Sequence, residues 1–273
     1  MSIKIREFHS AGDRYSEQGK WNFDNRIRKK VRRQAMQKNL IVPEENYGEI
    51  MLTQVEPYLE ERTLAFPLER EKGKILACIR CRADSPKGVV VISHGYTESA
   101  EKYKEIIYYF VKEGYHVYMA EHCGHGKSYR LTEDPHLVHV DSYLRCVEDL
   151  LFVGQKAREE NPDLTLFLYG HSMGGGIGAA AAAREPELFQ KVILSSPMSR
   201  PLTGGAPWGL ARAAVGLACA LGRKGAYGNG RPYDGKEKFE ESASLSKERF
   251  EYYQEKRKRQ PKLQMSGASF GKL

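Results

Sequence analysis

The sequence has few cysteines, and their placement excludes a disulfide-rich secreted domain. Five cysteines are spread through 273 residues, an odd number with no disulfide-framework spacing. Cys78 and Cys81 form a single C-x-x-C motif inside the strand-like residues 74–82. Because residues three apart in a strand point to opposite faces, the two thiols suit neither a metal site nor a redox pair. A reduced, intracellular protein is therefore favoured.

Long hydrophobic runs are also missing. Residues 1–7 contain no apolar stretch of signal-peptide length. The longest apolar region, residues 208–221, contains Arg212 and is shorter than the roughly 20 residues that span a bilayer. We therefore expect a cytoplasmic protein, with association with a membrane surface left open.

The composition is that of a globular protein with unevenly distributed charge. Hydrophobic residues make up 41% and charged residues 29%, which excludes a disordered chain. The length allows one large α/β domain with an inserted cap, or two smaller domains. The formal net charge is +8, and residues 1–40 hold eleven Lys/Arg against four Asp/Glu.

Residues 1–60 are interpreted as a basic N-terminal extension. Ile27, Val31 and Ala35 recur every four residues, which predicts a basic helix with a narrow apolar stripe. Such a segment is either a solvated helix that packs on the protein body, or one that favours an anionic surface of lipid or nucleic acid.

From residue 62 onward, strands and helices are predicted to alternate. Residues 63–68 and 74–82 are expected to form an antiparallel hairpin, and residues 88–93 are an apolar run typical of a buried parallel strand. Further strands are expected at residues 116–120, 164–169 and 191–195, and helices at residues 100–113, 142–160 and 174–184. This order predicts a mostly parallel sheet with helices on both faces and the N-terminal hairpin at one edge.

Beyond residue 199 the alternation stops. Residues 200–230 are rich in Gly, Ala and Pro, and residues 236–262 form a highly charged helical stretch. We interpret residues 61–199 as the core of an α/β fold and residues 200–273 as a partial helical cap over the sheet.

The motif with the clearest chemical meaning is Gly170-His171-Ser172-Met173-Gly174. It stands directly between a predicted buried strand and a predicted helix, which is the context that a G-x-S-x-G nucleophile elbow requires. Gly170 and Gly174 are expected to lack side chains because strand and helix approach closely there. A phosphate-binding loop would need G-x-G-x-x-G or a following Lys-Ser/Thr. Ser172 is therefore predicted to be a nucleophile.

A second segment fits the same chemistry. His94-Gly95-Tyr96 follows the strand at residues 88–93, where half of an oxyanion hole is built in this kind of fold. The backbone N–H groups of Tyr96 and Met173 are predicted to bind the negative oxygen of a tetrahedral intermediate. For His94 we expect a structural role in shaping the loop.

With these residues in place, the sequence resembles the lysophospholipase and monoacylglycerol lipase branch of the α/β-hydrolases, which is also described as serine-aminopeptidase-like. The resemblance runs from about residue 62 to the end of the chain. It rests on three ordered blocks: His94-Gly95, Gly124-His125-Gly126-Lys127-Ser128, and Gly170-His171-Ser172-Met173-Gly174-Gly175. Before the middle block, Glu121-His122-Cys123 replaces the family's usual Asp-x-Arg, a departure that bears on loop packing more than on chemistry.

The resemblance implies an esterase that forms an acyl-enzyme on Ser172. The implied substrate is a small lipid ester with one fatty acyl chain, such as a lysophospholipid or a monoacylglycerol. No cofactor, no metal and no nucleic acid partner is expected. Residues 208–221 of the cap either contact the acyl chain or form a plain structural helix, and contact with a membrane surface through the cap and the basic N-terminal helix remains open.

The rest of a catalytic triad is missing from its expected place. In this fold the order along the chain is Ser, then Asp or Glu, then His, yet all eight histidines precede Ser172 and the only later Asp is Asp234. We therefore expect a C-terminally truncated hydrolase that lacks its last strands and has at best weak activity. A non-catalytic fragment that binds lipid or membrane is the alternative.

Four upstream histidines allow other interpretations. His122 and His125 could replace the missing base, but loop packing is favoured for both. His136 and His139 are three residues apart, a spacing that could suggest metal ligands, yet without a third ligand they are expected to be ordinary loop histidines.

Overall fold

A computed structural model describes residues 41–200 and 205–270. The predicted basic helix with Ile27, Val31 and Ala35 lies outside the described residues. The chain from Val42 onward forms one compact unit. The extension predicted over residues 1–60 therefore has a different boundary in the structure, because residues 42–60 belong to this unit.

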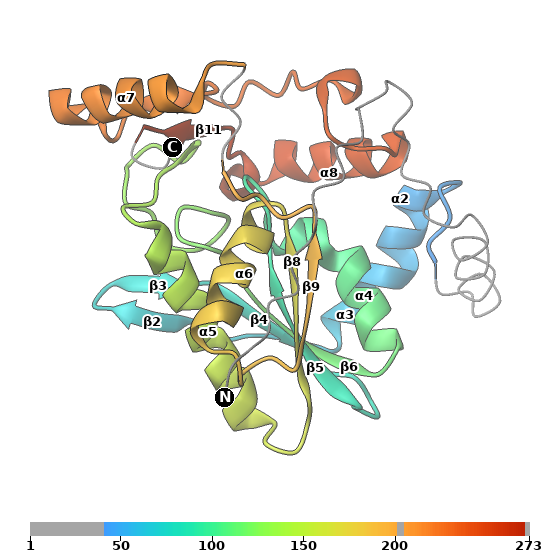
Figure 1. The fold of residues 1–273 in the computed structure, drawn as a ribbon. Coiled ribbons are helices and arrows are strands. Elements are labelled where there is room, and N and C mark those ends of the chain that lie inside the picture. The colour runs from blue at the N-terminus through green and yellow to red at the C-terminus, as the bar shows by residue number, and fades with distance from the viewer. Residues whose placement is uncertain (1–40, 201–204, 271–273) are drawn as a thin grey trace, which may run out of the picture. The chain divides into compact units, whose positions relative to one another are not determined.

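The centre of the unit is a six-stranded sheet with the order β1-β4-β6-β5-β8-β9 (Figure 1). The strands are β1 (Thr63–Ala65), β4 (Cys78–Cys81), β6 (Tyr115–Ala120), β5 (Gly88–Ser93), β8 (Leu166–His171) and β9 (Lys191–Ser195). Pairing is parallel from β6 to β9 and antiparallel among β1, β4 and β6. A two-stranded hairpin of β2 (Leu68–Glu71) and β3 (Lys74–Leu76) joins β1 to β4. The predicted mostly parallel sheet with an antiparallel edge is confirmed.

Helices cover both faces of this sheet, as predicted. One face packs against α5 (Tyr143–Glu160) and α6 (Met173–Arg184), and the other against α4 (Lys104–Lys112) and the N-terminal helices. Strand β5 is buried along its whole length, with Val89 and Val91 in the first core and Val90 and Ile92 in the second. An uninterrupted apolar run is what such a strand needs.

The two cysteines of the C-x-x-C motif also lie on opposite faces. Cys78 belongs to the core under α5 and α6, and Cys81 belongs to the core under α4. Burial raises the pKa of the Cys78 thiol to about 12 and that of Cys81 to about 11. Both thiols are therefore protonated packing groups, as the strand periodicity predicted.

Residues 47–60 form a helical segment that packs on the sheet. It consists of α2 (Tyr47–Ile50), a π-helical stretch (Met51–Val55) and α3 (Glu56–Glu60). Met51 and Val55 are 1% and 0% exposed, and both lie in the core that includes α4. Their burial explains why this part of the chain joins the compact unit.

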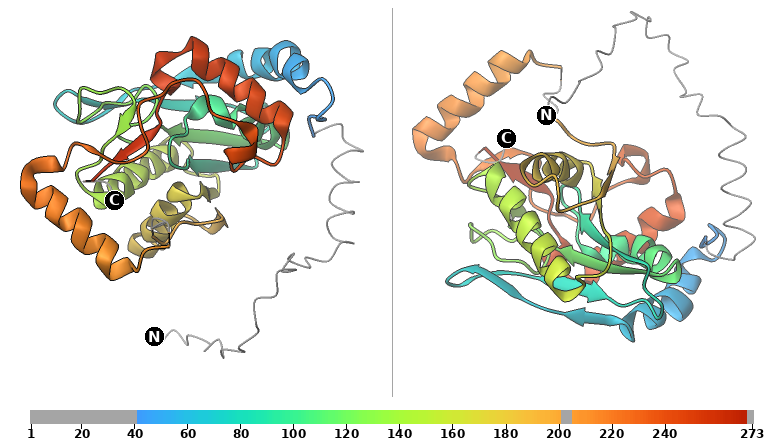
Figure 2. Two further views of the ribbon diagram at one scale, coloured as in Figure 1. Left: turned by 90° about the horizontal axis from the view of Figure 1, so that it is seen from above. Right: turned by 60° about the horizontal axis from the view of Figure 1, so that its bottom comes forward.

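The residues after β9 lie beyond the carboxyl ends of the parallel strands (Figures 1 and 2). They include α7 (Trp208–Ala218), β10 (Tyr227–Asn229), α8 (Lys247–Arg259) and β11 (Gly267–Ser269). Strand β11 pairs in parallel with β7 (Leu137–Val138) and antiparallel with β10, so the segment is joined to the body by a small sheet. Along the described residues, no helix combines the length and apolar character needed to cross a bilayer.

Candidate active site

The predicted nucleophile occupies a sharp turn between β8 and α6. Ser172 has φ 51° and ψ −119°, a conformation that is unfavourable for a residue with a Cβ. The turn is held by its neighbours, because the Ser172 N–H donates to the Ser195 carbonyl at 3.0 Å and the Met198 N–H donates to the Ser172 carbonyl at 2.9 Å. These two bonds fix a strained backbone and leave Ser172 half-buried at the end of the strand.

The glycines of the elbow lie where strand and helix touch. A Cβ on Gly170 would be 2.7 Å from the Gly174 carbonyl oxygen, and a Cβ on Gly175 would be 2.9 Å from Pro197 Cα. A Cβ on Gly174 would overlap the carbonyl oxygens of Ser93 and His94. The structure therefore gives the small residues of the motif the close approach that the sequence predicted.

The loop with the predicted oxyanion donor lies beside this elbow. Strand β5 pairs with β8 in a register that sets Ser93 opposite Gly170, so the segments after both strands leave the sheet at the same edge. His94 is fully buried, accepts the His122 N–H at Nε2 (2.8 Å) and contacts the Gly95 carbonyl through Nδ1 (2.8 Å). Because Nε2 is an acceptor, the ring proton is on Nδ1, which donates to Gly95. His94 thus shapes the loop.

Sequence reasoning missed Glu98 in this loop. Its side chain is buried, and its carboxylate accepts hydrogen bonds from the Gly95 N–H at 2.7 Å and the Tyr103 hydroxyl at 2.7 Å. Lys102 Nζ lies 2.6 Å from the other carboxylate oxygen. The sequence signal was a single acidic residue in a turn, and such a residue is usually exposed.

The rings of His122 and His125 pack against His94. The ring centroids lie 4.5 Å and 5.0 Å from that of His94. His122 Nε2 is 3.0 Å from Ser93 Oγ, and His125 Nδ1 is 3.0 Å from the Cys123 carbonyl. These contacts favour the packing role over that of a substitute base.

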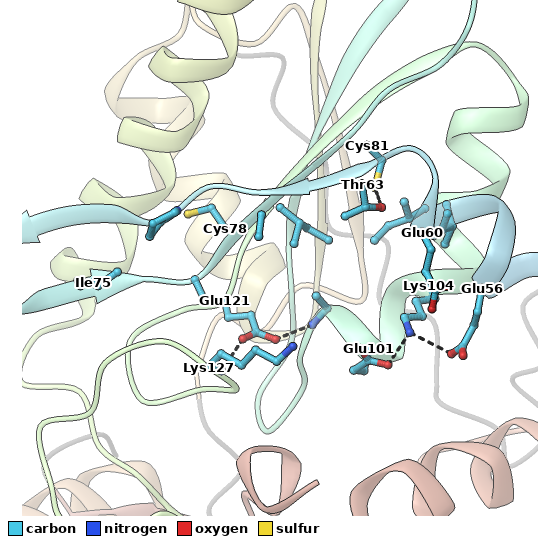
Figure 3. Close-up of a pocket in the computed structure, with 17 residues that line it drawn as sticks. Glu56, Glu60, Thr63, Ile75, Cys78, Cys81, Glu101, Lys104, Glu121 and Lys127 are labelled. Atoms are coloured by element: carbon cyan, nitrogen blue, oxygen red, sulfur yellow. Dashed lines mark hydrogen bonds and ion pairs between the residues drawn. The ribbon is translucent and has the colours of Figure 1, made fainter. Parts of the chain in front are cut away.

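The unusual Glu121 fits its loop. Its carboxylate accepts the Ala100 N–H at 3.0 Å and the Lys127 N–H (Figure 3). The Ser128 hydroxyl donates to the Glu121 backbone carbonyl. Burial raises the pKa of the Glu121 carboxyl. The departure from Asp-x-Arg is therefore accommodated by hydrogen bonds to two nearby segments, at Ala100 and at residues 127–128.

His136 and His139 connect the body to the end of the described chain. His136 Nδ1 lies 2.7 Å from the Gln264 carbonyl, and His139 Nδ1 lies 2.7 Å from Ser269 Oγ. Within residues 41–200 and 205–270, no group of three or more His, Cys, Asp or Glu side chains is arranged to hold a metal ion. Both histidines act as loop residues.

Asp234, the one aspartate after Ser172, belongs to the segment that follows β10. Its carboxylate pairs with Arg231 at 3.0 Å and accepts the Lys236 N–H at 3.0 Å. These local contacts give it a place in the turn around residues 231–236.

The structure contains a cavity of about 550 Å³ whose lining does not include Ser172 (Figure 3). It is bounded by the β1–β4 edge, α3 and the start of α4, and most of its wall is apolar. Lys104 Nζ stands there between Glu56 Oε1 at 3.0 Å and Glu101 Oε2 at 2.8 Å. Ser172, Tyr96 and Met173 are not among its lining residues, so the candidate site rests on the geometry of the elbow.

A strained serine between a buried parallel strand and a glycine-rich helix, at the carboxyl edge of such a sheet, defines an α/β-hydrolase. The family model described as serine aminopeptidase, S33, matches residues 84–260. The chain belongs to this family, and the predicted family and fold are confirmed.

Curated relatives match less than half of the chain. Lysophospholipase L2 of Escherichia coli (strain K12) is 37% identical over 120 residues, which cover 44% of this chain and 35% of that protein. Monoacylglycerol lipase of Mycolicibacterium smegmatis is 37% identical over 122 residues, or 45% of this chain and 42% of that protein. The chain thus spans about two fifths of the length of such relatives.

Solved structures agree on the fold. A soluble variant of monoglyceride lipase from Saccharomyces cerevisiae matches with a TM-score of 0.55 at 16% identity, over 77% of this chain and 65% of that one. A carboxyl esterase from Bacillus coagulans matches with a TM-score of 0.50 at 21% identity, over 61% and 53% of the two chains. At these identities the likeness is one of fold alone.

Proposed function

We propose that the protein is a serine hydrolase of carboxylic esters that forms an acyl-enzyme on Ser172. The observation that carries the proposal is the strained backbone of Ser172 at the junction of β8 and α6. Such a turn lifts the hydroxyl out of the sheet toward a substrate carbonyl. Attack by Ser172 Oγ forms a tetrahedral intermediate, and the N–H groups of Tyr96 and Met173 stabilise its oxyanion.

The proposed substrate is a small lipid ester with one acyl chain, such as a monoacylglycerol or a lysophospholipid. The names of the relatives from Escherichia coli and Mycolicibacterium smegmatis support this choice. The apolar helix α7 supports it further, since Leu210 and Leu217 are 68% and 62% exposed and offer surface to an acyl chain. The five free cysteines support a cytoplasmic location.

Turnover by this chain is proposed to be slow. Every histidine precedes Ser172 in the sequence, and His94, His122 and His125 make packing contacts in their own loops. Without a base, the serine hydroxyl keeps its proton and is a poor nucleophile. An oxyanion hole and substrate binding alone still leave roughly 10³–10⁴-fold catalysis over water in related chemistry.

A fluorophosphonate probe tests the nucleophile directly. We expect slow covalent labelling of the full chain at Ser172, loss of labelling in Ser172→Ala, and unchanged labelling in Ser242→Ala, a half-buried serine beyond β10. Mass spectrometry of the labelled peptide identifies the residue. Labelling elsewhere, or none in the parent chain, would overturn the proposal, and rapid labelling would show that a base is present after all.

A second candidate function is a non-catalytic module that binds lipid or membrane. The observation in its favour is that none of the residues of α7 is buried, while residues 205–233 contain Arg and Lys but no Asp or Glu. An exposed apolar helix beside positive charge suits an anionic bilayer surface. Binding to anionic vesicles that survives Ser172→Ala but is lost in Leu210→Gln/Leu217→Gln, or on deletion of residues 1–40, would favour this function.

A further inference from the structure

Glu98 is held by three partners within its own loop. One carboxylate oxygen, Oε2, accepts the Gly95 N–H and the Tyr103 hydroxyl, each at 2.7 Å, and Oε1 lies 2.6 Å from Lys102 Nζ. Glu98 is 6% exposed and Tyr103 is 5% exposed. Both carboxylate oxygens of this buried side chain are therefore satisfied by hydrogen bonds.

The backbone turn from Gly95 to Glu98 is strained and requires a stabilising contact. Thr97, between Tyr96 and Glu98, has φ 55°, a left-handed conformation that is unfavourable for a β-branched residue. The backbone bond that closes the turn, from the Glu98 N–H to the Gly95 carbonyl, is long at 3.4 Å. The bond from the Gly95 N–H to the Glu98 carboxylate is therefore the shorter of the two that close this turn.

This anchor acts on the peptide group that carries the predicted oxyanion donor. The Tyr96 N–H and the Gly95 carbonyl belong to one planar trans peptide group and point in opposite directions. His94 Nδ1 fixes the Gly95 carbonyl at 2.8 Å, and Glu98 fixes the Gly95 N–H. Because hydrogen bonds hold both the N–H and the carbonyl of Gly95, the peptide group between Gly95 and Tyr96 is fixed in one orientation. The Tyr96 N–H therefore points in one direction only.

The negative charge of Glu98 is compensated by Lys102 in the same loop. Burial by itself would raise the pKa of the Glu98 carboxyl, but Lys102 and the Tyr103 hydroxyl outweigh it and hold the pKa below its ordinary value. The group is thus an ionised acceptor at neutral pH. Lys102 balances its negative charge, so that the charge of the anchor does not oppose an oxyanion formed nearby.

We propose that Glu98 is the positioning residue of the oxyanion loop: by holding the Gly95 N–H it orients the Tyr96 N–H toward the intermediate formed on Ser172. This inference rests on the proposed function. Glu98 itself touches neither the substrate nor the reacting atoms. Its removal should therefore slow the chemical step and leave binding of the substrate unchanged.

The test compares Glu98→Ala and Glu98→Gln with a matched control, Glu56→Ala. Glu56 is also a buried carboxylate with Lys and Tyr partners, since Lys104, Lys256 and the Tyr252 hydroxyl all contact its Oε1, but it lies on α3. Two quantities are measured on the full chain: the rate and half-saturation of fluorophosphonate labelling at Ser172, and hydrogen–deuterium exchange of the peptide containing residues 95–97.

In Glu98→Ala we expect labelling at saturating probe to slow about 10- to 100-fold, since loss of a whole oxyanion donor costs about 10²–10³-fold. The half-saturating probe concentration should stay the same, and exchange at residues 95–97 should accelerate. Glu98→Gln should recover most of the rate, because its amide oxygen can accept the same Gly95 N–H. Glu56→Ala should leave both the labelling rate and the exchange of this peptide unchanged.

Two results would overturn the inference. One is labelling and exchange in Glu98→Ala equal to those of the parent chain, and the other is a Glu98→Gln variant as slow as Glu98→Ala. If the parent chain is not labelled at all, the proposed function fails instead. The exchange experiment then decides by itself whether Glu98 orders the loop, with unchanged exchange in Glu98→Ala counting against it.

Discussion

Gly174 packs directly on the backbone of Ser93. Strand β5 ends at Ser93 and α6 begins one residue before Gly174, and a Cβ on Gly174 would occupy the same space as the Ser93 carbonyl oxygen. The start of α6 thus rests on the end of β5, between the elbow and the loop that follows β5. Backbone atoms cannot move aside as a flexible side chain can, so this contact fixes the relative position of the two halves of the candidate site.

Gly174→Ala should destabilise the protein by about 1–3 kcal/mol, the usual range for overpacking. The matched control is Gly216→Ala in α7, where a Cβ would meet nothing within 4 Å and where alanine is favoured over glycine by up to about 1 kcal/mol. Urea unfolding followed by circular dichroism measures both. Equal stability of the two variants would show that the close approach at Gly174 is absent in solution.

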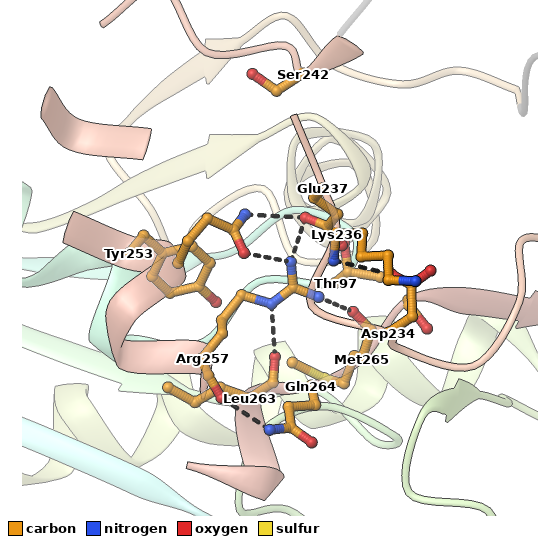
Figure 4. Close-up of polar contacts among 12 residues, drawn as sticks. Thr97, Asp234, Lys236, Glu237, Ser242, Tyr253, Arg257, Leu263, Gln264 and Met265 are labelled. Atoms are coloured by element: carbon orange, nitrogen blue, oxygen red, sulfur yellow. Dashed lines mark hydrogen bonds and ion pairs between the residues drawn. The ribbon is translucent and has the colours of Figure 1, made fainter. Parts of the chain in front are cut away.

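Arg257→Met should loosen the segment that follows β10. The Arg257 guanidinium is buried, donates to the carbonyls of Leu263 at 3.1 Å and Met265 at 2.8 Å, and pairs with Glu237 (Figure 4). A hydrogen bond to a charged group is worth about 1.5–3 kcal/mol, so loss of the two bonds to carbonyls should cost about 3–6 kcal/mol in total.

The control for Arg257 is Arg259→Met on the same helix, whose side chain is 80% exposed and whose loss should change stability by less than about 0.5 kcal/mol. Limited proteolysis of residues 231–266 reports on the segment itself. Unchanged protection in the Arg257 variant would contradict the proposed role of the guanidinium.

Ile193→Lys should reduce self-association. In the described part of the chain β9 is an edge strand that pairs with β8 alone, and Ile193 and Leu194 are 53% and 36% exposed. An apolar strand edge with open backbone groups recruits other strands, and a lysine blocks this pairing. Sedimentation velocity should show larger species in the parent chain and fewer in the variant.

Leu245→Lys provides the comparison, since Leu245 is fully exposed but lies far along the chain from β9. It should leave self-association unchanged. A parent chain that is monomeric at high concentration and unfolds cooperatively with a high midpoint would contradict the expectation for this edge.

His116 should make stability depend on pH. Burial, together with Arg82, lowers the pKa of His116 below 6.5, and its Nδ1 accepts the Ala83 N–H at 3.0 Å. The unfolded chain therefore binds this proton at higher pH than the folded chain does. Its contribution to stability is present above pH 6.5 and is lost as the pH falls through the lowered folded-state pKa.

His116→Gln keeps an acceptor for Ala83 but does not titrate. We expect the free energy of unfolding to fall less in this variant than in the parent chain when the pH is lowered from 7.5 to 5.5. Urea titrations at both pH values measure the difference, and parallel pH profiles would rule out His116 as the source.

Several elements could be predicted from the sequence because their signals are local. The apolar run at residues 88–93 became β5 with the same bounds, and the helix expected from residue 142 begins after Ser142, whose hydroxyl accepts the Leu144 N–H as an N-cap. Strand β8 was expected at residues 164–169 but spans Leu166–His171. Its bounds follow from pairing with β5, which continues to Gly170 and which no local pattern encodes.

By itself, the sequence determined the alternation of strands and helices and the glycine-flanked Ser172 between them, since periodicity and small residues act over a few positions. Only the tertiary structure decided which polar groups are buried and what they bind. Glu98 is buried in the loop after β5, where its carboxylate binds the Gly95 N–H. His94 accepts the backbone N–H of His122, 28 residues along the chain, because β5 and β6 are neighbours in the sheet. The sequence alone does not show whether a carboxylate or an imidazole faces water or the core. Its environment is set by chain segments that come into contact only after folding.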